Sequence, residues 1–211
     1  PLIESNRYDA QKVQFRFSRL YLPGNMPKMM LNAGIHHPNG VILDLEDSVA
    51  PDRKHEARYL IRNALRGIDY YGAERMVRIN QFPMGKEDLK FVIPHHVHTL
   101  LVPKCEGAHQ IKELEEEIDK IRKEHDIQRS IFLMPILESA LGIEKAYEIA
   151  TASENVVAMA IGLEDYTADI GTRRTNEAKE SLYARTRLVN ACKAARIQAI
   201  DSVFSDVGDE E

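Results

Sequence analysis

The hydrophobic positions of this chain follow two alternating patterns, short continuous apolar runs and longer amphipathic stretches. Residues 41–43 (Val-Ile-Leu) form a run of the first kind, which is typical of a strand that is buried on both faces. Residues 51–68 follow the second pattern, because their apolar side chains recur at the three- and four-residue spacing of one helix face. Pro51 and Asp52 are typical of a first helical turn. Together the patterns predict a buried strand followed by a helix.

Strand patterns of this kind recur along the chain and are separated by helical patterns. We expect seven strands, at residues 18–22, 41–43, 75–80, 99–103, 130–137, 155–162 and 198–204. The connections are short and no stretch has the composition of a linker, so residues 1–211 are expected to form one α/β domain with a parallel sheet.

The repeat length decides between two parallel-sheet architectures. The units average about thirty residues, as in a TIM (β/α)₈ barrel of roughly 250 residues. An open doubly wound sheet is the competing architecture, but it needs a phosphate-binding loop after its first strand. Residues 22–27 (Leu-Pro-Gly-Asn-Met-Pro) contain no G-x-G-x-x-G motif. We therefore expect a (β/α)₈ barrel with seven βα units visible and the last strand and C-terminal tail missing.

The composition excludes several classes of protein. With 211 residues and a formal net charge of −5, the chain does not have the basic character of a general nucleic-acid or membrane-surface binder. Its two cysteines, Cys105 and Cys192, lie far apart, which favours reduced thiols. No apolar run approaches the roughly 18 residues of a membrane span, and residues 1–6 lack the pattern of a signal peptide. We expect a cytoplasmic location.

The residues that could carry chemistry stand where the predicted strands end. Since the ends of parallel strands converge on one mouth of a barrel, these residues are expected to lie together. They are Asn25, the acids Asp44, Glu46 and Asp47, then Arg78, Lys104, Glu138, Glu164 and Asp165. Carboxylates held together take up protons unless a cation balances them. No His or Cys ends a strand, which argues against zinc and for Mg²⁺. The guanidinium of Arg78 could grip a substrate carboxylate.

Two other features receive a structural interpretation. His95, His96 and His98 have a metal-like spacing, but they precede their strand and so belong to the opposite, stabilising end of a barrel. Lys104 ends its strand and is a candidate for a covalent imine, although a site rich in metal-type acids makes an imine unnecessary.

Seven segments in register resemble the citrate lyase β-subunit family of the HpcH/HpaI aldolase group, whose relatives are malyl-CoA and citramalyl-CoA lyases. The segments are LYLPGN (20–25), LDLEDSVAP (43–51), VRIN (77–80), VPK (102–104), LESALG (137–142), IGLEDY (161–166) and QAIDSV (198–203). The resemblance implies a Mg²⁺-dependent barrel that cleaves the carbon–carbon bond of a 3-hydroxyacyl-CoA. For the β-subunit itself, the products are acetyl-CoA and an oxo acid, oxaloacetate.

The resemblance also implies roles for individual residues. Glu138 and Asp165 match the family's metal ligands, and Glu46 and Asp47 match the acids that hold metal-bound waters. We expect the latter two to take part in catalysis, with the base itself left open. Arg78 matches the arginine that grips the oxo-acid carboxylate.

Two further cations belong to the expected substrate site. Arg16 is similar to a basic residue beside the carboxylate-binding arginine, and Lys104 is a candidate substrate contact. We expect the small-molecule partners to be a CoA thioester and an oxo acid.

Where the sequence departs from the family pattern, several alternatives stay open. The family continues with another strand, a Gly-Lys and an Ile-His-Pro pattern, and a helical tail whose acid reaches a neighbouring subunit. We therefore expect a longer polypeptide, a homo-oligomer (trimer or hexamer) or a larger lyase complex. Malyl-CoA or citramalyl-CoA lyase activity, thioesterase activity, and a non-catalytic metal- and CoA-binding role are the alternative functions.

Overall fold

The computed structural model describes residues 2–203, and its strands form one seven-stranded parallel sheet. The strands lie in chain order, each paired with the next, as the alternating patterns predict. They are β1 (Arg19–Pro23), β2 (Gly40–Asp44), β3 (Glu74–Arg78), β4 (Thr99–Val102), β5 (Phe132–Leu137), β6 (Ala158–Ile161) and β7 (Gln198–Ile200). The expected last strand reached residue 204, which lies outside the described residues.

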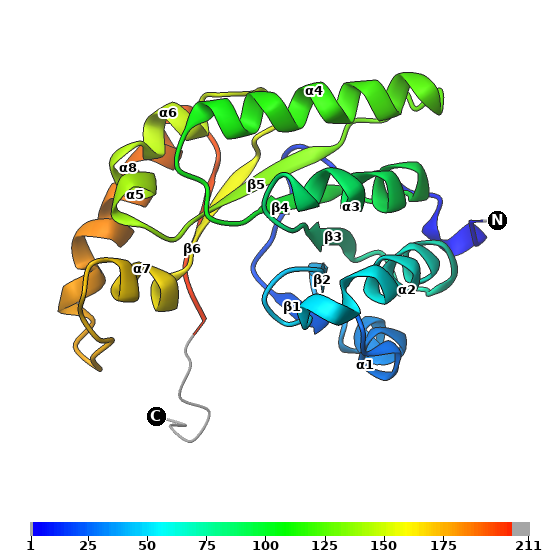
Figure 1. The fold of residues 1–211 in the computed structure, drawn as a ribbon, viewed down its shortest axis with the longest axis horizontal. Helices are drawn as coiled ribbons and strands as arrows, with labels where there is room; N and C mark the ends of the chain where they lie inside the picture. The colour runs from blue at the N-terminus through cyan, green and yellow to red at the C-terminus, as the bar shows by residue number, and fades with distance from the viewer. Residues whose placement is uncertain (1, 204–211) are drawn as a thin grey trace.

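Helices lie along the outer side of the open sheet, as Figure 1 shows. They are α1 (Pro27–Asn32), α2 (Lys54–Gly67), α3 (Met84–Val92), α4 (Ala108–Glu124), α5 (Ala140–Glu144), α6 (Ala146–Ala150), α7 (Leu163–Asp169) and α8 (Leu182–Ala195). The helical stretch between β5 and β6 is divided at Lys145 into the two short helices α5 and α6. The short helix α7 was not predicted from the sequence.

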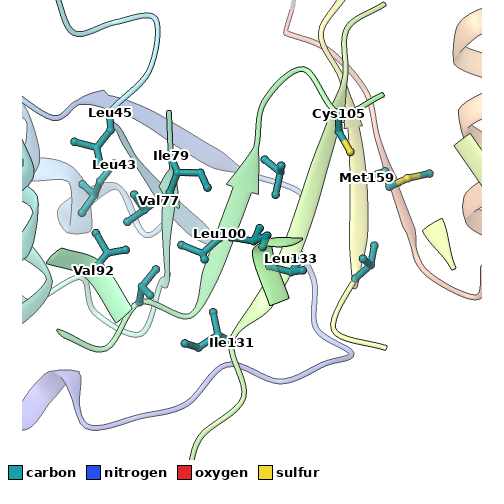
Figure 2. Close-up of a cluster of buried hydrophobic side chains, with 14 of the residues drawn as sticks. Leu43, Leu45, Val77, Ile79, Val92, Leu100, Cys105, Ile131, Leu133 and Met159 are labelled. Carbon is teal, nitrogen blue, oxygen red and sulfur yellow. The ribbon is translucent and has the colours of Figure 1, made fainter. Parts of the chain in front are cut away.

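The sheet buries apolar side chains on both faces, which explains why its strands read as continuous apolar runs. Val41, Leu43 and their counterparts pack against the helices, in the cluster that Figure 2 shows with Val77, Leu100 and Leu133. The alternate positions form a smaller cluster on the inner face: Ile42, Met76, Leu101, Met134, Ile136, Ala158, Ala160 and Ile200. The period of two is that of an extended strand.

Within residues 2–203 the sheet does not close on itself. β1 pairs only with β2, and β7 only with β6, so both are edge strands in the described part of the chain. The parallel order agrees with the predicted barrel, but a closed barrel is not formed by these residues. No described helix combines the length and the apolar character that a membrane span requires.

A closed polar layer covers the amino-terminal ends of the strands. Glu74, the first residue of β3, accepts hydrogen bonds from Arg16 Nε (2.7 Å) and Nη2 (3.1 Å) and from the hydroxyl of Thr99. Next to it the guanidinium of Arg75 lies 2.9 Å from His98 Nε2, and both side chains are buried. His98 thus lies at the stabilising end, as its position before β4 predicts.

Candidate active site

The turn after β2 is organised by the carboxylate of Asp44, which is 1% exposed. Its Oδ1 accepts the main-chain N–H of Glu46 at 2.9 Å, and its Oδ2 accepts the N–H (3.0 Å) and the hydroxyl (2.5 Å) of Ser48. An aspartate that binds the backbone two and four residues later fixes a tight turn. Glu46 and Asp47 are therefore held at the end of β2, where the sequence predicted them.

Arg78, the last residue of β3, is the cation of this site. Its Nε and Nη2 donate to Oδ1 and Oδ2 of Asp44 at 2.7 and 2.6 Å, while Nη1 lies 3.2 Å from Glu46 Oε2 and 3.7 Å from Asp47 Oδ2. Although burial opposes ionisation in both groups, their hydrogen bonds and opposite charges lower the pKa of Asp44 and raise the pKa of Arg78.

The partnership with Asp44 changes the predicted use of Arg78. One edge of the guanidinium, Nε with Nη2, is already occupied by this carboxylate, so only the Nη1–Nη2 end can receive a substrate. Sequence reasoning placed Asp44 among the acids but missed this role. Asp44 and Arg78 are opposite each other in the parallel register of β2 and β3, and this register is not contained in the pattern of either strand alone.

Glu138 and Asp165 form the second part of the site. Glu138 follows β5 and is 6% exposed, whereas Asp165 lies in the first turn of α7. Burial, followed by the hydrogen bond and charge of Asp165, raises the pKa of Glu138 to about 8. The hydrogen bond from Glu138 lowers the pKa of Asp165, against the effect of its own partial burial. Near neutral pH the two carboxyl groups therefore share one proton.

The backbone at Gly162 leaves room for the Glu138 side chain. A Cβ atom on Gly162 would lie 2.7 Å from Cγ and 3.1 Å from Cδ of Glu138. Both distances are shorter than a normal carbon–carbon contact of about 3.5 Å. The glycine of the sequence segment IGLEDY therefore permits the position of the carboxyl group.

Lys104 is a cation in direct contact with this pair. The Lys104 ammonium lies 3.2 Å from Asp165 Oδ2, and this contact raises the pKa of Lys104 although partial burial opposes it. Lys104 follows β4 with a left-handed backbone (φ 47°) that is uncommon for a residue other than glycine. The neighbouring acid Glu164 is held instead by Arg174, at 2.6 Å.

A cavity of about 460 Å³ joins the two parts of the site. Asp47, Arg78, Glu138 and Asp165 all line it, and so does Tyr21, whose ring centroid lies 5.4 Å from Arg78 Cζ. Its deeper wall is apolar and consists of Met134, Ile136, Ala160 and Ile200. Glu46, Lys104 and Asn25 are not among its lining residues, although Glu46 contacts Arg78. The predicted residues of several strand ends thus converge, and Tyr21 is an unpredicted addition.

The donors suit Mg²⁺ better than a softer metal. In the described part of the chain, no three His, Cys, Asp or Glu side chains converge closely enough to hold an ion by themselves. Glu138 and Asp165 offer two carboxylates beside an open cavity, and Mg²⁺ usually takes one or two carboxylates and completes its shell with water and substrate. The raised pKa of Glu138 indicates an excess of negative charge, which a bound cation would balance. The residues present therefore fit a magnesium ion.

Arg16 is not part of this site, and its predicted place beside Arg78 is wrong. Its guanidinium pairs with Glu74, at the first residue of β3, while Arg78 is the last residue of that strand. Four residues of extended chain separate the two ends by about 13 Å. Arg16 also binds Gln198 at the start of β7, so it stabilises the amino-terminal ends of the strands. The resemblance to the family predicts a place near the site, but Arg16 precedes β1 and therefore lies at the other end of the sheet.

Known proteins are similar to this chain in sequence and in fold. Residues 18–211 match the family described as HpcH/HpaI aldolase/citrate lyase. The citrate lyase subunit beta of Leuconostoc mesenteroides subsp. cremoris is 39% identical over 201 residues, which cover 94% of this chain and 67% of that protein. The mitochondrial citramalyl-CoA lyase of Homo sapiens is 31% identical over 202 residues, covering 90% of this chain and 59% of its own length.

A solved structure of a citrate lyase beta subunit is also similar to this chain. The citrate lyase beta subunit from Mycobacterium tuberculosis, complexed with oxaloacetate and magnesium, superposes with a TM-score of 0.75 at 27% identity and covers 98% of this chain and 84% of that one. The family match over most of the chain, together with these relatives, leads to one conclusion. The chain belongs to the HpcH/HpaI aldolase/citrate lyase family.

Proposed function

We propose that the chain is a Mg²⁺-dependent lyase that cleaves the carbon–carbon bond of a 3-hydroxyacyl-CoA of the citryl-CoA type, giving acetyl-CoA and an oxo acid such as oxaloacetate. The observation that carries the proposal is the cavity in which Arg78 faces the proton-sharing pair Glu138 and Asp165. A carboxylate-binding cation and a magnesium-type acid pair in one cavity are what a 3-hydroxy acid with a carboxylate requires. The citrate lyase and citramalyl-CoA lyase relatives support the same chemistry.

Arg78 would bind the substrate carboxylate through its free end. Asp44 holds the Nε and Nη2 edge, and Glu46 contacts Nη1 from one side, which leaves one N–H on each of Nη1 and Nη2 for the ligand. The Tyr21 ring lies beside the guanidinium, at a distance that permits a cation–π contact. A carboxylate received there lies between Arg78 and the pair Glu138 and Asp165, which would hold the metal ion.

The reaction needs a proton acceptor and a place for negative charge. A base removes the proton of the 3-hydroxyl group, the C–O bond becomes a carbonyl, the C2–C3 bond breaks, and its electron pair becomes the thioester enolate. The enolate then takes a proton at carbon to give acetyl-CoA. Mg²⁺, when bound, polarises the hydroxyl and carboxylate oxygens of the substrate and lowers the pKa of the hydroxyl.

Asp47 is the carboxylate that we propose as the proton acceptor. Its side chain is 57% exposed and lines the cavity, whereas that of Glu46 is 7% exposed and lies against Arg78. Burial and the hydrogen bond with Asp47 raise the pKa of Glu46, so Glu46 acts by holding its neighbour in place. Asp47→Asn should therefore lower kcat more than it raises KM, and an unchanged kcat would remove Asp47 from the mechanism.

Lys104 is proposed as a substrate contact that becomes free when a metal ion binds. In the structure its ammonium balances Asp165, as a divalent cation would. A cation at Glu138 and Asp165 would release Lys104 toward the negatively charged substrate, at the edge of the cavity.

The test is a lyase assay of the purified protein with Mg²⁺ against citryl-CoA, malyl-CoA and citramalyl-CoA. Release of acetyl-CoA and oxaloacetate from citryl-CoA supports the proposal. Faster cleavage of malyl-CoA or citramalyl-CoA would change the proposed substrate but leave the proposed reaction, carbon–carbon cleavage, unchanged. Hydrolysis of the thioester without carbon–carbon cleavage would identify a thioesterase. Metal and CoA binding without turnover would identify the non-catalytic role. The oligomeric state and the cellular location stay predictions.

A further inference from the structure

Lys54, the first residue of α2, reaches back to the acidic turn that follows β2. Its Nζ donates to the carbonyl oxygens of Leu45 (2.6 Å) and Glu46 (2.5 Å). Both oxygens belong to the main chain of the turn that carries Glu46 and Asp47. Hydrogen bonds from a charged donor are short and stronger than those between neutral groups.

The turn is thus held from two sides. From one side the Asp44 carboxylate accepts the N–H groups of Glu46 and Ser48, and from the other side Lys54 donates to two of the turn's carbonyl groups. The N–H of Asp47 is bound within the turn, to Glu46 Oε2 at 3.0 Å. The orientation of both acidic side chains therefore depends on a backbone whose N–H and C=O groups are bound to two charged side chains.

Helix α2 is fixed to the end of the next strand as well. One turn after Lys54, Arg58 Nε donates to Asp88 Oδ1 at 2.7 Å, and Asp88 Oδ2 accepts from the main chain and side chain of Asn80 at 2.7 and 2.8 Å. Arg58, Asp88 and Asn80 are all buried. Since Asn80 follows Arg78 by two residues, the start of α2 holds the turns after β2 and β3 in a fixed relation.

We propose that Lys54 is a positioning residue, which fixes the backbone of residues 45–48 so that Glu46 and Asp47 lie against Arg78 and Asp47 lines the cavity. This inference rests on the proposed function for its catalytic consequence, but not for its structural part. Two effects of Lys54 oppose each other. Its positive charge lies near Asp44, Glu46, Asp47 and Asp88 and would by itself weaken the binding of a metal cation. Its hydrogen bonds to the backbone instead hold Glu46 and Asp47 in place, which would favour the binding of a metal cation and its substrate.

The variant Lys54→Met separates the two effects, because it keeps the length of the side chain and removes both the charge and the donors. If the charge dominates, Mn²⁺ used as a probe should bind more tightly to the variant. If positioning dominates, Mn²⁺ should bind more weakly and kcat should fall, each by about tenfold, as is usual for residues that support a metal site from behind its ligands. Electron paramagnetic resonance measures free Mn²⁺ directly.

Hydrogen exchange on the metal-free protein gives a readout that does not depend on activity. The amides of Glu46, Asp47 and Ser48 should exchange about tenfold faster in Lys54→Met, while the amide of Leu45, which is bound to Arg78 O in the strand ladder, keeps its protection. Lys90→Met is the matched control, since Lys90 is exposed on α3 and its ammonium pairs with Glu87, at 2.7 Å, on the same helix. It should change none of these quantities.

Lys54→Arg completes the test, since it keeps the charge but cannot place a single nitrogen between two carbonyl oxygens in the same way. In Lys54→Arg the amides of residues 46–48 should exchange faster than in wild type and more slowly than in Lys54→Met. If the Met variant does not fold, the Arg variant alone is compared with wild type. Unchanged exchange in residues 46–48, or tighter Mn²⁺ binding with unchanged kcat, would overturn the positioning role. A wild type without lyase activity would reject the proposed function, while the exchange data would still decide the role of Lys54 in the turn.

Discussion

Each end of the sheet contains an arginine–carboxylate ion pair, but the two pairs have different surroundings. At the amino-terminal ends, Arg16 and Glu74 form a bidentate pair whose side chains are 1% and 0% exposed. At the carboxyl-terminal ends, Arg78 and Asp44 form a bidentate pair as well, but Arg78 is also close to Glu46 and Asp47 and borders a cavity. The first pair is balanced and enclosed. The second has more acids than its cation can balance.

The two ends of the sheet also differ in the pKa shifts of their buried groups. At the amino-terminal end, burial and the charge of Arg75 lower the pKa of His98 to about 3, so this group stays neutral and needs no counter-ion. At the other end, burial and Asp165 raise the pKa of Glu138 to about 8, so this carboxyl group holds a proton in the absence of a cation. The Arg16–Glu74 pair is enclosed and its two charges balance each other, whereas excess acids beside a cavity are typical of a site that receives a ligand.

The largest effect is expected from removing a proposed metal ligand. Glu138→Ala should lower kcat/KM by about 10³-fold or more, because the ion's effect on the substrate oxygens is worth several kcal/mol. Glu164→Ala is the matched control, since this acid is next to Asp165 but pairs with Arg174. Steady-state kinetics with Mg²⁺ compares the two variants. Full activity in Glu138→Ala would refute the assignment of Glu138.

The same substitution should affect substrate binding at Arg78 and stability at Arg16. Arg78→Lys should raise KM for the thioester by about 10- to 100-fold, because an ammonium cannot bind Asp44 and a substrate carboxylate with a planar fork. Arg16→Lys should leave KM unchanged and lower the free energy of unfolding by about 1–3 kcal/mol. Kinetics and urea denaturation of both variants test the comparison. A raised KM in Arg16→Lys would return Arg16 to the substrate site.

Acid should destabilise the amino-terminal end through His98. The pKa of this imidazole is about 3 in the folded chain and ordinarily 6.5, so between these values the unfolded chain binds a proton that the folded chain does not. Stability due to this group is therefore present above pH 6.5 and is lost as the pH falls, by about 2 kcal/mol from pH 7 to pH 5. Urea denaturation across this range should show a smaller dependence of stability on pH in His98→Gln. An equal dependence in both proteins would exclude His98 as its source.

The smallest effect is expected at Gly162. An added methyl group would displace Glu138, but the carboxyl group stays at the site, so Gly162→Ala should weaken Mg²⁺ affinity by only about tenfold. Gly67→Ala is a suitable control, because its Cβ would meet no atom within 4 Å. Affinity in Gly162→Ala equal to that of wild type would mean that Glu138 has room to adapt.

The sequence predicts the strands and their ends well, because apolar runs and the polar residues after them are local signals. Arg78, Glu138 and Asp165 were found in this way, and all three line one cavity. The pairing of Asp44 with Arg78 depends on the register between two strands, which the pattern of one strand does not contain. The helix that carries Asp165 was missed because α7 spans only Leu163–Asp169, which is too short for its buried face (Leu163, Tyr166 and Thr167) to stand out as a repeat in the sequence.

Arg16 illustrates a different limit. It precedes β1 and was assigned to the site by its similarity to a basic residue of the family, but that similarity does not show toward which end of the sheet the guanidinium points. Only the position of Glu74 and Gln198 shows which end it occupies. Residue type and motif therefore predicted the site, while three-dimensional neighbours decided which cation belongs to it.

The central claim, that Glu138 and Asp165 bind Mg²⁺ in exchange for a shared proton, can be tested by calorimetry. Mg²⁺ titrated into the metal-free protein at pH 7, in buffers with different ionisation enthalpies, reports the number of protons released. Because the pKa of Glu138 is about 8, binding should release close to one proton in wild type. Glu138→Gln should bind more weakly and release almost none. Binding of Mg²⁺ without proton release in wild type, or with equal affinity in the variant, would contradict the account.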